Sequence, residues 1–309
     1  EKTDQYVQQY NTILEAVTNK FGKENVQYVP GVLYNETGKY FEDSIVNIDA
    51  SVQAAMKADY ILLCIGENSY TETPGNTNDL DLYDNQLALA NALIKTGKPV
   101  IFILNEGRPR IISRIEPGAS AILDIYLPGN YGADALADIL TGDVDPSGKL
   151  PITYPRYTND LVGYIHKPSE GSGNPQGGET NPQYSFGFGL SYTNFSYSNL
   201  SVNKKSFDPG ETATISVTVT NTGNREGKEV AQLFISDLIA SFTPDVKRLR
   251  GFEKVDIKPG ESKRIEFKIP LKQLSFVGPD NKKHLEEGDF KIQVADQTLE
   301  FSLNKTIVF

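Results

Sequence analysis

The run Tyr60-Ile61-Leu62-Leu63-Cys64-Ile65 leads directly into the polar stretch Gly66-Glu67-Asn68-Ser69-Tyr70-Thr71-Glu72-Thr73-Pro74-Gly75. A short apolar run bounded by a glycine-containing polar segment predicts a buried strand followed by a loop. Open α/β sheets bind their ligands beyond the carboxyl ends of the strands, so this loop with its two carboxylates is where we expect chemistry. Cys64, the single cysteine, is predicted to be a small buried side chain within the strand.

Further apolar runs at residues 100–104 and 121–125 are predicted to be strands of the same sheet. They do not alternate between apolar and polar residues, which indicates burial on both faces and a mostly parallel sheet between helix layers. An α/β domain is therefore predicted over residues 1–160. Its other expected elements are a helix from Asp4 to Phe21 capped by Thr3 or Asp4 and ended by Gly22, a short strand at 26–29, and helices at 51–58, 84–94 and 132–140.

The texture of the chain changes after this domain. Residues 161–191 are rich in Pro, Gly, Asn and Ser and are predicted to be a linker. From residue 192 the pattern is that of an all-β domain: residues 212–220 alternate strictly, and Pro209-Gly210 and Pro259-Gly260 mark turns. Several short strands spaced in this way predict an immunoglobulin-like or fibronectin type III-like β-sandwich over residues 192–309.

Composition narrows the classes of partner. The formal net charge of −10 argues against nucleic acid and anionic membranes, and it is compatible with a neutral ligand such as a sugar. No apolar run is long enough to predict a transmembrane helix, and one cysteine allows no disulfide within the chain. The chain shows no signal peptide and opens on a predicted helix, which suggests a fragment or a processed product.

Four stretches, taken in this order and followed by a predicted β-sandwich, resemble the C-terminal part of family 3 glycoside hydrolases, the β-glucosidase group. Each motif alone is weakly specific, but in this order they are a strong signal, and the resemblance covers almost the whole chain. They are Gly66-Glu67-x-x-Tyr70-x-Glu72-x-x-Gly75, then Asn105-Glu106-Gly107-Arg108-Pro109, then the stretch from Leu127-Pro128-Gly129-Asn130-Tyr131-Gly132 to Leu150-Pro151-Ile152-Thr153-Tyr154-Pro155, and finally Tyr184-Ser185-Phe186-Gly187-Phe188-Gly189-Leu190-Ser191-Tyr192.

The resemblance implies a retaining β-glycosidase whose (β/α)8 barrel, carrying the aspartate nucleophile, precedes an α/β sandwich domain and often a fibronectin type III-like domain. This chain matches the second and third of these domains only. The resemblance therefore implies a carbohydrate substrate, a barrel in the same protein or in a partner chain, and a secreted or periplasmic location. No cofactor is predicted, and no metal site is assigned. Residues 1–309 alone are expected to be inactive, because an acid without a nucleophile lacks most of the transition-state stabilisation.

Retaining hydrolysis needs two carboxyl groups about 5–5.5 Å apart, one a nucleophile and the other an acid/base. By its position in the matching motif, Glu72 is the candidate acid/base, although a glutamate in a polar loop is by itself most often only solvated. Tyr70 is expected to support the loop or to line the aglycone side. Glu67 follows the strand directly, so an anchor that accepts backbone N–H bonds is favoured over catalysis. Asn76 stands where the family pattern often has Asp, which bears on how the loop is anchored.

Other features of the sequence favour structural roles. Arg108 is interpreted as structural, and residues 129–142 lack the Gly-Lys-Ser/Thr ending of a phosphate-binding loop. His166 and His284 have no partners at the spacing of a zinc site. The aspartates between residues 79 and 84 lack the central glycine and terminal glutamate of an EF-hand loop, so calcium is disfavoured.

Two rival interpretations remain open. A carbohydrate-binding or adhesion module that kept this fold without a barrel is the first, because fold alone does not fix function. Exposed ordered aromatic residues favour that module, whereas the absence of Trp counts mildly against it. The second is a split glycosidase, in which a separately encoded barrel assembles with this chain, and an exposed apolar patch on the α/β domain favours it.

Overall fold

A computed structural model describes residues 9–34, 43–68, 76–160, 163–167 and 181–309 of the chain. Contacts divide the chain into two compact units, Glu1–Val144 with Tyr154–Leu161 and Asp145–Thr153 with Val162–Phe309. The domain limits drawn from the sequence, 1–160, 161–191 and 192–309, stay predictions. Tyr70 and Glu72 lie outside the described residues.

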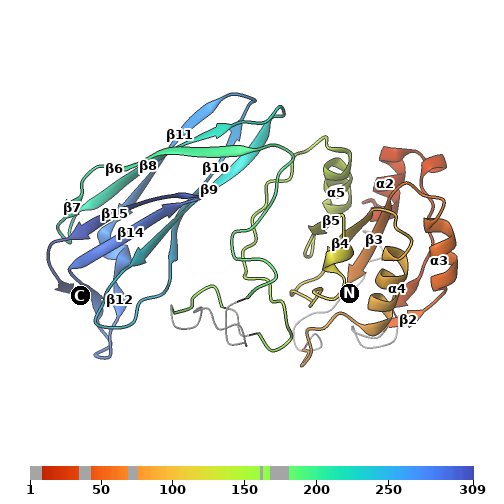
Figure 1. Cartoon of the computed structure of the whole chain (residues 1–309), viewed down its shortest axis with the longest axis horizontal. Helices are drawn as coiled ribbons and strands as arrows, with labels where there is room; N and C mark the ends of the chain where they lie inside the picture. Colours follow the sequence, from red (N-terminus) through yellow and green to blue (C-terminus); the bar gives the residue numbers. More distant parts are fainter. Residues whose placement is uncertain (1–8, 35–42, 69–75, 161–162, 168–180) are drawn as a thin grey trace. The chain divides into compact units, whose positions relative to one another are not determined.

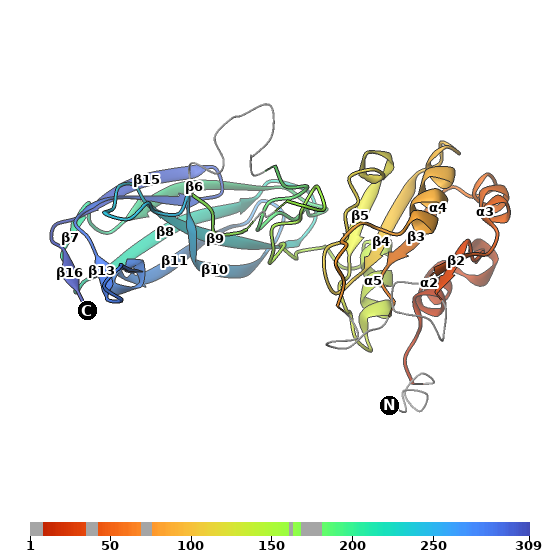
Figure 2. The same cartoon turned by 90° about the horizontal axis from the view of Figure 1, so that it is seen from below.

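The first unit is an α/β structure, as predicted (Figure 1). Its strands β3, β4 and β5 pair in that order, and both pairings are parallel. Helices α4 and α5 lie on opposite faces of this sheet (Figure 2). The elements are α2 (Ile13–Phe21), η1 (Lys23–Asn25), β1 (Val32–Tyr34), β2 (Asp43–Ile45), α3 (Ile48–Ala55), β3 (Ile61–Gly66), α4 (Asp84–Ile94), β4 (Val100–Asn105), η3 (Glu116–Gly118), β5 (Ala121–Asp124) and α5 (Gly132–Thr141).

Burial differs between the central strand and its neighbour. On β4, Phe102 and Ile103 point to opposite faces and both are fully buried, as an apolar run without alternation predicts. On β3, Leu63 and Ile65 are buried on one face, but Cys64 on the other face is exposed. The prediction that Cys64 is buried is therefore wrong. Within the described residues β3 pairs with β4 alone, and at such an edge one face of a strand can be left uncovered.

Helix α2 begins later than predicted. Its N-cap is Thr12, whose hydroxyl accepts the N–H of Glu15 at 3.2 Å while the Glu15 carboxylate accepts the N–H of Thr12 at 2.8 Å. This reciprocal capping box satisfies two backbone groups and starts the helix at Ile13, so residues 9–12 are not helical. The predicted end at Gly22 is confirmed.

The strand predicted at residues 26–29 does not form among the described residues. Val26 has extended backbone angles, but no ladder of hydrogen bonds joins this segment to another described strand. The nearby helix α2 packs instead on α5 through Ala16, Ala133 and Ala137, small residues that let the two helices approach closely. Lys20 at the end of α2 reinforces this contact by pairing with Asp138 and Asp143.

The second unit is the predicted β-sandwich (Figure 1). A sheet ordered β10-β9-β14-β15-β7 faces a sheet ordered β11-β8-β6, and a small sheet β12-β13-β16 closes one end. The strands are β6 (Phe195–Val202), β7 (Ser206–Phe207), β8 (Thr212–Asn221), β9 (Gly227–Asp237), β10 (Arg248–Ile257), β11 (Ser262–Pro270), β12 (Phe276–Val277), β13 (Lys283–Leu285), β14 (Gly288–Val294), β15 (Gln297–Leu303) and β16 (Ile307–Val308), with η5 (Leu271–Leu274) between β11 and β12.

The sandwich core follows from the alternation of its strands. Ile215 and Val217 of β8 face Leu233 of β9 and Ile292 of β14, and all four side chains are fully buried. Ser216, between them on β8, points to the other face, as the period of two requires, and its hydroxyl there accepts a bond from Nη2 of Arg264 at 3.0 Å. The alternation that predicted the sandwich therefore also identifies which side chains form its interior.

A short segment from the middle of the chain belongs to this second unit. We call Asp145–Thr153 the strap. Leu150 donates its N–H to Phe188 O and accepts the N–H of Gly187, both at 2.8 Å. The Lys149 ammonium donates to Gly189 O at 3.0 Å and pairs with Glu229 of β9 at 3.2 Å. The strap is thus bound to the segment before β6 and to β9.

Candidate active site at the carboxyl edge of the parallel sheet

Strand β3 ends at a glycine that the packing requires. Gly66 has a φ of 135°, and a Cβ placed there would lie 2.2 Å from the carbonyl oxygen of Asn105 at the end of β4. No larger residue fits this close approach. Glu67 continues the pairing by donating its N–H to Asn105 O at 2.9 Å. The start of the loop is therefore fixed against β4.

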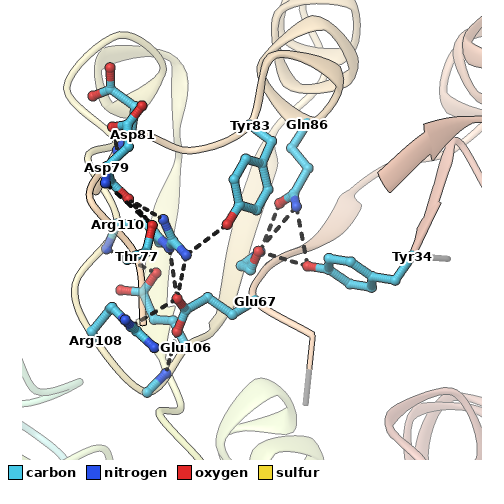
Figure 3. A network of polar contacts seen from close by, with 12 residues as sticks. Tyr34, Glu67, Thr77, Asp79, Asp81, Tyr83, Gln86, Glu106, Arg108 and Arg110 are labelled. Atoms are coloured by element: carbon cyan, nitrogen blue, oxygen red, sulfur yellow. Dashed lines mark hydrogen bonds and ion pairs between the residues drawn. The ribbon is translucent and has the colours of Figure 1, made fainter. Parts of the chain in front are cut away.

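Helix α4 holds the other edge of Gly66. The Gln86 amide accepts the Gly66 N–H at 2.9 Å and donates to Gly66 O at 3.0 Å, which imitates the bonds of a neighbouring strand. The Tyr34 hydroxyl donates to the same carbonyl at 2.7 Å. Gln86 is buried, so this polar contact is made inside the fold (Figure 3). Both edges of the strand end are thereby satisfied.

Glu67 is buried and accepts several bonds. Its Oε2 accepts the N–H of Gly107 at 3.1 Å, and its Oε1 lies 3.1 Å from Nε of Arg108 and 2.8 Å from Nε of Arg110. Only 1% of the Glu67 side chain is exposed. This arrangement of a backbone N–H and two guanidinium groups around one carboxylate suits the anchor role suggested by the sequence (Figure 3).

Arg110 is the centre of the network, and its side chain is fully buried. Nη1 donates to Asp79 O at 2.8 Å, and Nη2 donates to the Tyr83 hydroxyl at 2.8 Å and pairs with Glu67 at 2.5 Å. The guanidinium carbon also lies 5.0 Å from the centre of the Tyr83 ring. One side chain therefore joins the segment before residues 69–75 to the segment after them (Figure 3).

A second buried carboxyl group follows β4. Glu106 is 1% exposed, and burial raises its pKa to about 8, with the charges of Asp124 and Glu67 adding to the effect. The Tyr154 hydroxyl lies 2.7 Å from both Glu106 Oε1 and Arg110 O. A single hydroxyl proton serves one acceptor, so a protonated Glu106 that donates to Tyr154 leaves the tyrosine proton for Arg110 O. This arrangement agrees with the raised pKa.

A third carboxyl group ends β5. Burial raises the pKa of Asp124 to about 6, although its Oδ1 accepts the N–H of Tyr126 at 3.0 Å. Tyr126 has a φ of 50°, an unusual value for a residue other than glycine. The Tyr126 side chain also interacts with the Asp124 carboxyl, and within the described residues Asp124 Oδ2 and the Tyr126 hydroxyl have no hydrogen-bond partner beyond this interaction. Unusual backbone angles of this kind cluster at functional sites.

The structure places the predicted site residues unevenly. Glu67 lies in the network, whereas Glu72 and Tyr70 fall outside the described residues, so their roles stay predictions. Arg108 pairs with Glu67, which suits the structural role assigned to it. The sequence reasoning missed Arg110 and gave Glu106 no role. Their signal was a charged residue soon after an apolar strand, because the carboxyl ends of parallel strands meet at one edge.

No cluster of three or more His, Cys, Asp or Glu side chains among the described residues is arranged to hold a metal ion. None of the described helices combines the length and apolar character needed to cross a bilayer.

Comparison with known proteins finds two matching domain families. Residues 2–192 match the "Glycosyl hydrolase family 3 C-terminal domain", and residues 229–298 match the "Fibronectin type III-like domain". The "Lysosomal beta glucosidase" of Dictyostelium discoideum is 43% identical over 93% of this chain and 35% of its own length. The "Periplasmic beta-glucosidase" of Salmonella typhimurium is 38% identical over 79% of this chain and 34% of its own length.

A solved structure is similar to this one over most of the chain. The β-glucosidase of Erythrobacter marinus superposes with a TM-score of 0.84 at 31% identity, over 95% of this chain and 43% of that one. The chain thus spans about a third of the length of the curated relatives it matches. From the match over residues 2–192, we conclude that this chain belongs to the glycosyl hydrolase family 3 C-terminal domain family.

Proposed function

We propose that this chain is the part of a retaining β-glycosidase that supplies the general acid/base, Glu72, to a nucleophile on a (β/α)8 barrel outside residues 1–309. Glu72 protonates the leaving glycosidic oxygen and then deprotonates the attacking water. Tyr70 supports the loop or lines the aglycone side, and Glu67 anchors the loop's start.

The observation that carries the proposal is the network at the carboxyl edge of the sheet. Residues on both sides of the stretch 69–75 are bound to the loop that follows β4, through Glu67 and Asp79. Burying a network of charged groups costs desolvation free energy, and such a network is well suited to fixing the residues on both sides of this stretch in one place. The resemblance of this stretch to the acid/base loop of the family supports the proposal.

The proposed substrates are β-glucosides, because the matched relatives from Dictyostelium discoideum and Salmonella typhimurium are named as β-glucosidases. The name of the second relative also supports a periplasmic or secreted location. An acidic chain with a net charge of −10 repels polyanionic ligands and has no such effect on neutral sugars.

The test is hydrolysis by the polypeptide that joins these residues to a barrel, with and without Glu72→Gln. The variant should reduce kcat/KM for an alkyl or cellobiose-type β-glucoside by about 10²–10⁴-fold, the usual contribution of general acid/base catalysis. Glu253→Gln, an exposed glutamate of β10 in the sandwich, is the matched control and should leave hydrolysis unchanged.

Two results contradict the proposal. Unchanged hydrolysis in Glu72→Gln removes the acid/base assignment. Sugar binding without hydrolysis of any β-glycoside, with or without a barrel, makes the carbohydrate-binding module the better interpretation.

A further inference from the structure

We propose that Arg110 is a positioning residue for the proposed acid/base Glu72, because it binds Glu67 and Asp79, which flank residues 69–75. This inference rests on the proposed function of Glu72. Arg110 is not proposed to touch the substrate, and it acts through Glu67 and Asp79.

The first step is that one guanidinium group binds the entry and the exit of the loop. On the entry side, Nε and Nη2 of Arg110 contact Oε1 of Glu67 at 2.8 and 2.5 Å. On the exit side, Nη1 donates to the carbonyl oxygen of Asp79 at 2.8 Å. Joining two ends of a loop through a rigid planar group removes conformations that the loop would otherwise visit.

The second step is that the exit flank is held a second time by the residue after Arg110. Ile111 donates its N–H to Leu80 O at 2.8 Å, and Asp81 forms an isolated parallel bridge with Ile111. Within the exit flank, Asp81 also donates its N–H to Oδ1 of Asp79 at 2.8 Å. Residues 79–81, which follow the proposed acid/base stretch, are therefore held by Arg110 and Ile111 of the loop after β4.

The third step is that Arg110 is itself immobilised. Its N–H donates to Glu106 Oε2 at 3.3 Å, and its carbonyl oxygen lies 2.7 Å from the Tyr154 hydroxyl. The side chain is fully buried and stacked near the Tyr83 ring. A positioning group needs such a second layer, because a shift of about 1 Å in a catalytic group can cost on the order of 100-fold in rate.

The fourth step is that a buried guanidinium is a poor way to gain stability. Replacing a buried ion pair by apolar residues of similar volume is often neutral or stabilising, because desolvation opposes the attraction between the charges. Lysine would bring a point charge without the fork that reaches Glu67 and Asp79 together. The arrangement therefore fits a role in geometry better than a role in stability.

The experiment compares Arg110→Gln and Arg110→Lys with Glu72→Gln in the polypeptide that carries the barrel. Arg114→Gln is the matched control, since Arg114 lies in the same segment, has a 65% exposed side chain and approaches Asp81 only to 3.8 Å. Each variant is assayed with aryl β-glucosides that have leaving groups of falling pKa. A leaving group of low pKa needs no protonation, so its rate of bond cleavage is insensitive to the acid.

We expect Arg110→Gln to lower kcat/KM about 10–100-fold for poor leaving groups and several-fold less for activated ones, a weaker copy of the Glu72→Gln pattern. Arg110→Lys should retain more activity with the same trend, and Arg114→Gln should match the unaltered protein. Added azide, a nucleophile that needs no general base, should restore part of kcat for activated substrates in both Glu72→Gln and Arg110→Gln.

Equal losses for all leaving groups in the Arg110 variants, or no loss, overturn the inference, since a change in the amount of folded enzyme affects every substrate alike. If Arg110→Gln does not fold, the leaving-group trend of Arg110→Lys decides. Failure of the proposed function is distinct, because Glu72→Gln itself would then show no dependence on the leaving group.

Discussion

Two buried carboxylates, Glu67 in the α/β unit and Glu229 in the sandwich, each pair with a cation. The two ion pairs differ in how far they are withdrawn from water and in where they lie in the fold. Glu67 is 1% exposed and meets the fully buried Arg110, and both residues lie in loops beyond strand ends. Glu229 is 11% exposed, sits within β9, and meets Lys149 of the strap, which keeps 15% of its side chain exposed. The Tyr197 hydroxyl of β6 donates to the same carboxylate at 2.9 Å.

The difference shows what each charge is used for. In the sandwich, the ammonium keeps contact with water and ties one segment to one sheet, so little desolvation is needed. At the carboxyl edge of the α/β sheet, a guanidinium gives up all its water to join three segments. Because a fully desolvated pair is expensive, its presence indicates a requirement for geometry at that edge, where α/β proteins place their sites.

The largest effect should come from Glu67→Gln. The amide keeps the bond from Gly107 but leaves the Arg110 guanidinium buried without its counter-charge. Removing one partner of a buried pair costs about 3–5 kcal/mol. We expect the free energy of unfolding of the α/β unit, measured by urea denaturation and circular dichroism, to fall by that amount. A fall below about 1 kcal/mol would show that Arg110 finds other partners and that the two carboxylates are alike after all.

The next effect depends on pH and concerns Glu106→Gln. The folded-state pKa of Glu106, about 8, lies above its ordinary value of 4.5, so its contribution to stability is lost as the pH rises between these values. Gln does not titrate. The variant should therefore resemble the parent near pH 5 and be more stable near pH 9, by up to roughly 1.4 kcal/mol per unit of pKa shift. Parallel unfolding profiles from pH 5 to 9 would contradict this reading of the carboxyl edge.

The smallest effect should come from Glu229→Gln. The amide still accepts from Tyr197, and Lys149 can turn its ammonium towards water, so a loss of about 1–2 kcal/mol is expected. Hydrogen exchange should show where it falls: the amides of Leu150 and Gly187, which pair the strap with its neighbour, should exchange faster while the β8 core amides do not. Unchanged protection of Leu150 would mean that the strap does not depend on this ion pair.

Local patterns in the sequence predicted most of the fold. Apolar runs identified β3, β4 and β5, and strict alternation identified β8 and β11 with their buried faces. These predictions succeed because burial imposes its period directly on the residues concerned. The predicted start of α2 was wrong because Asp4 and Thr12 are both residue types that cap helices well. The choice of Thr12 depends on its capping box with the side chain of Glu15, three residues further along.

Features that depend on strand order, or on contacts between loops distant in sequence, could not be predicted from the sequence. Cys64 was expected to be buried because an apolar run does not tell a central strand from one at the edge. Arg110 was passed over in favour of Arg108, since both follow β4 and only the folded chain brings Asp79 and Glu67 to the second of them. Glu67 lies inside a motif of the resemblance and was therefore considered, whereas Arg110 lies just outside the stretch Asn105–Pro109 and was not.

The strap has a consequence for how such proteins are assembled from parts in evolution and in the laboratory. The chain passes from one unit to the other at three points, after Val144, after Thr153 and after Leu161. A single crossover between genes therefore cannot exchange the sandwich intact, because a donor sequence starting at Ser191 arrives without Lys149 and Asp145. Asp145 binds the Ser191 hydroxyl and the Tyr192 N–H, so the recipient must already encode a strap compatible with the incoming strands. The two units are thus inherited most easily as one piece.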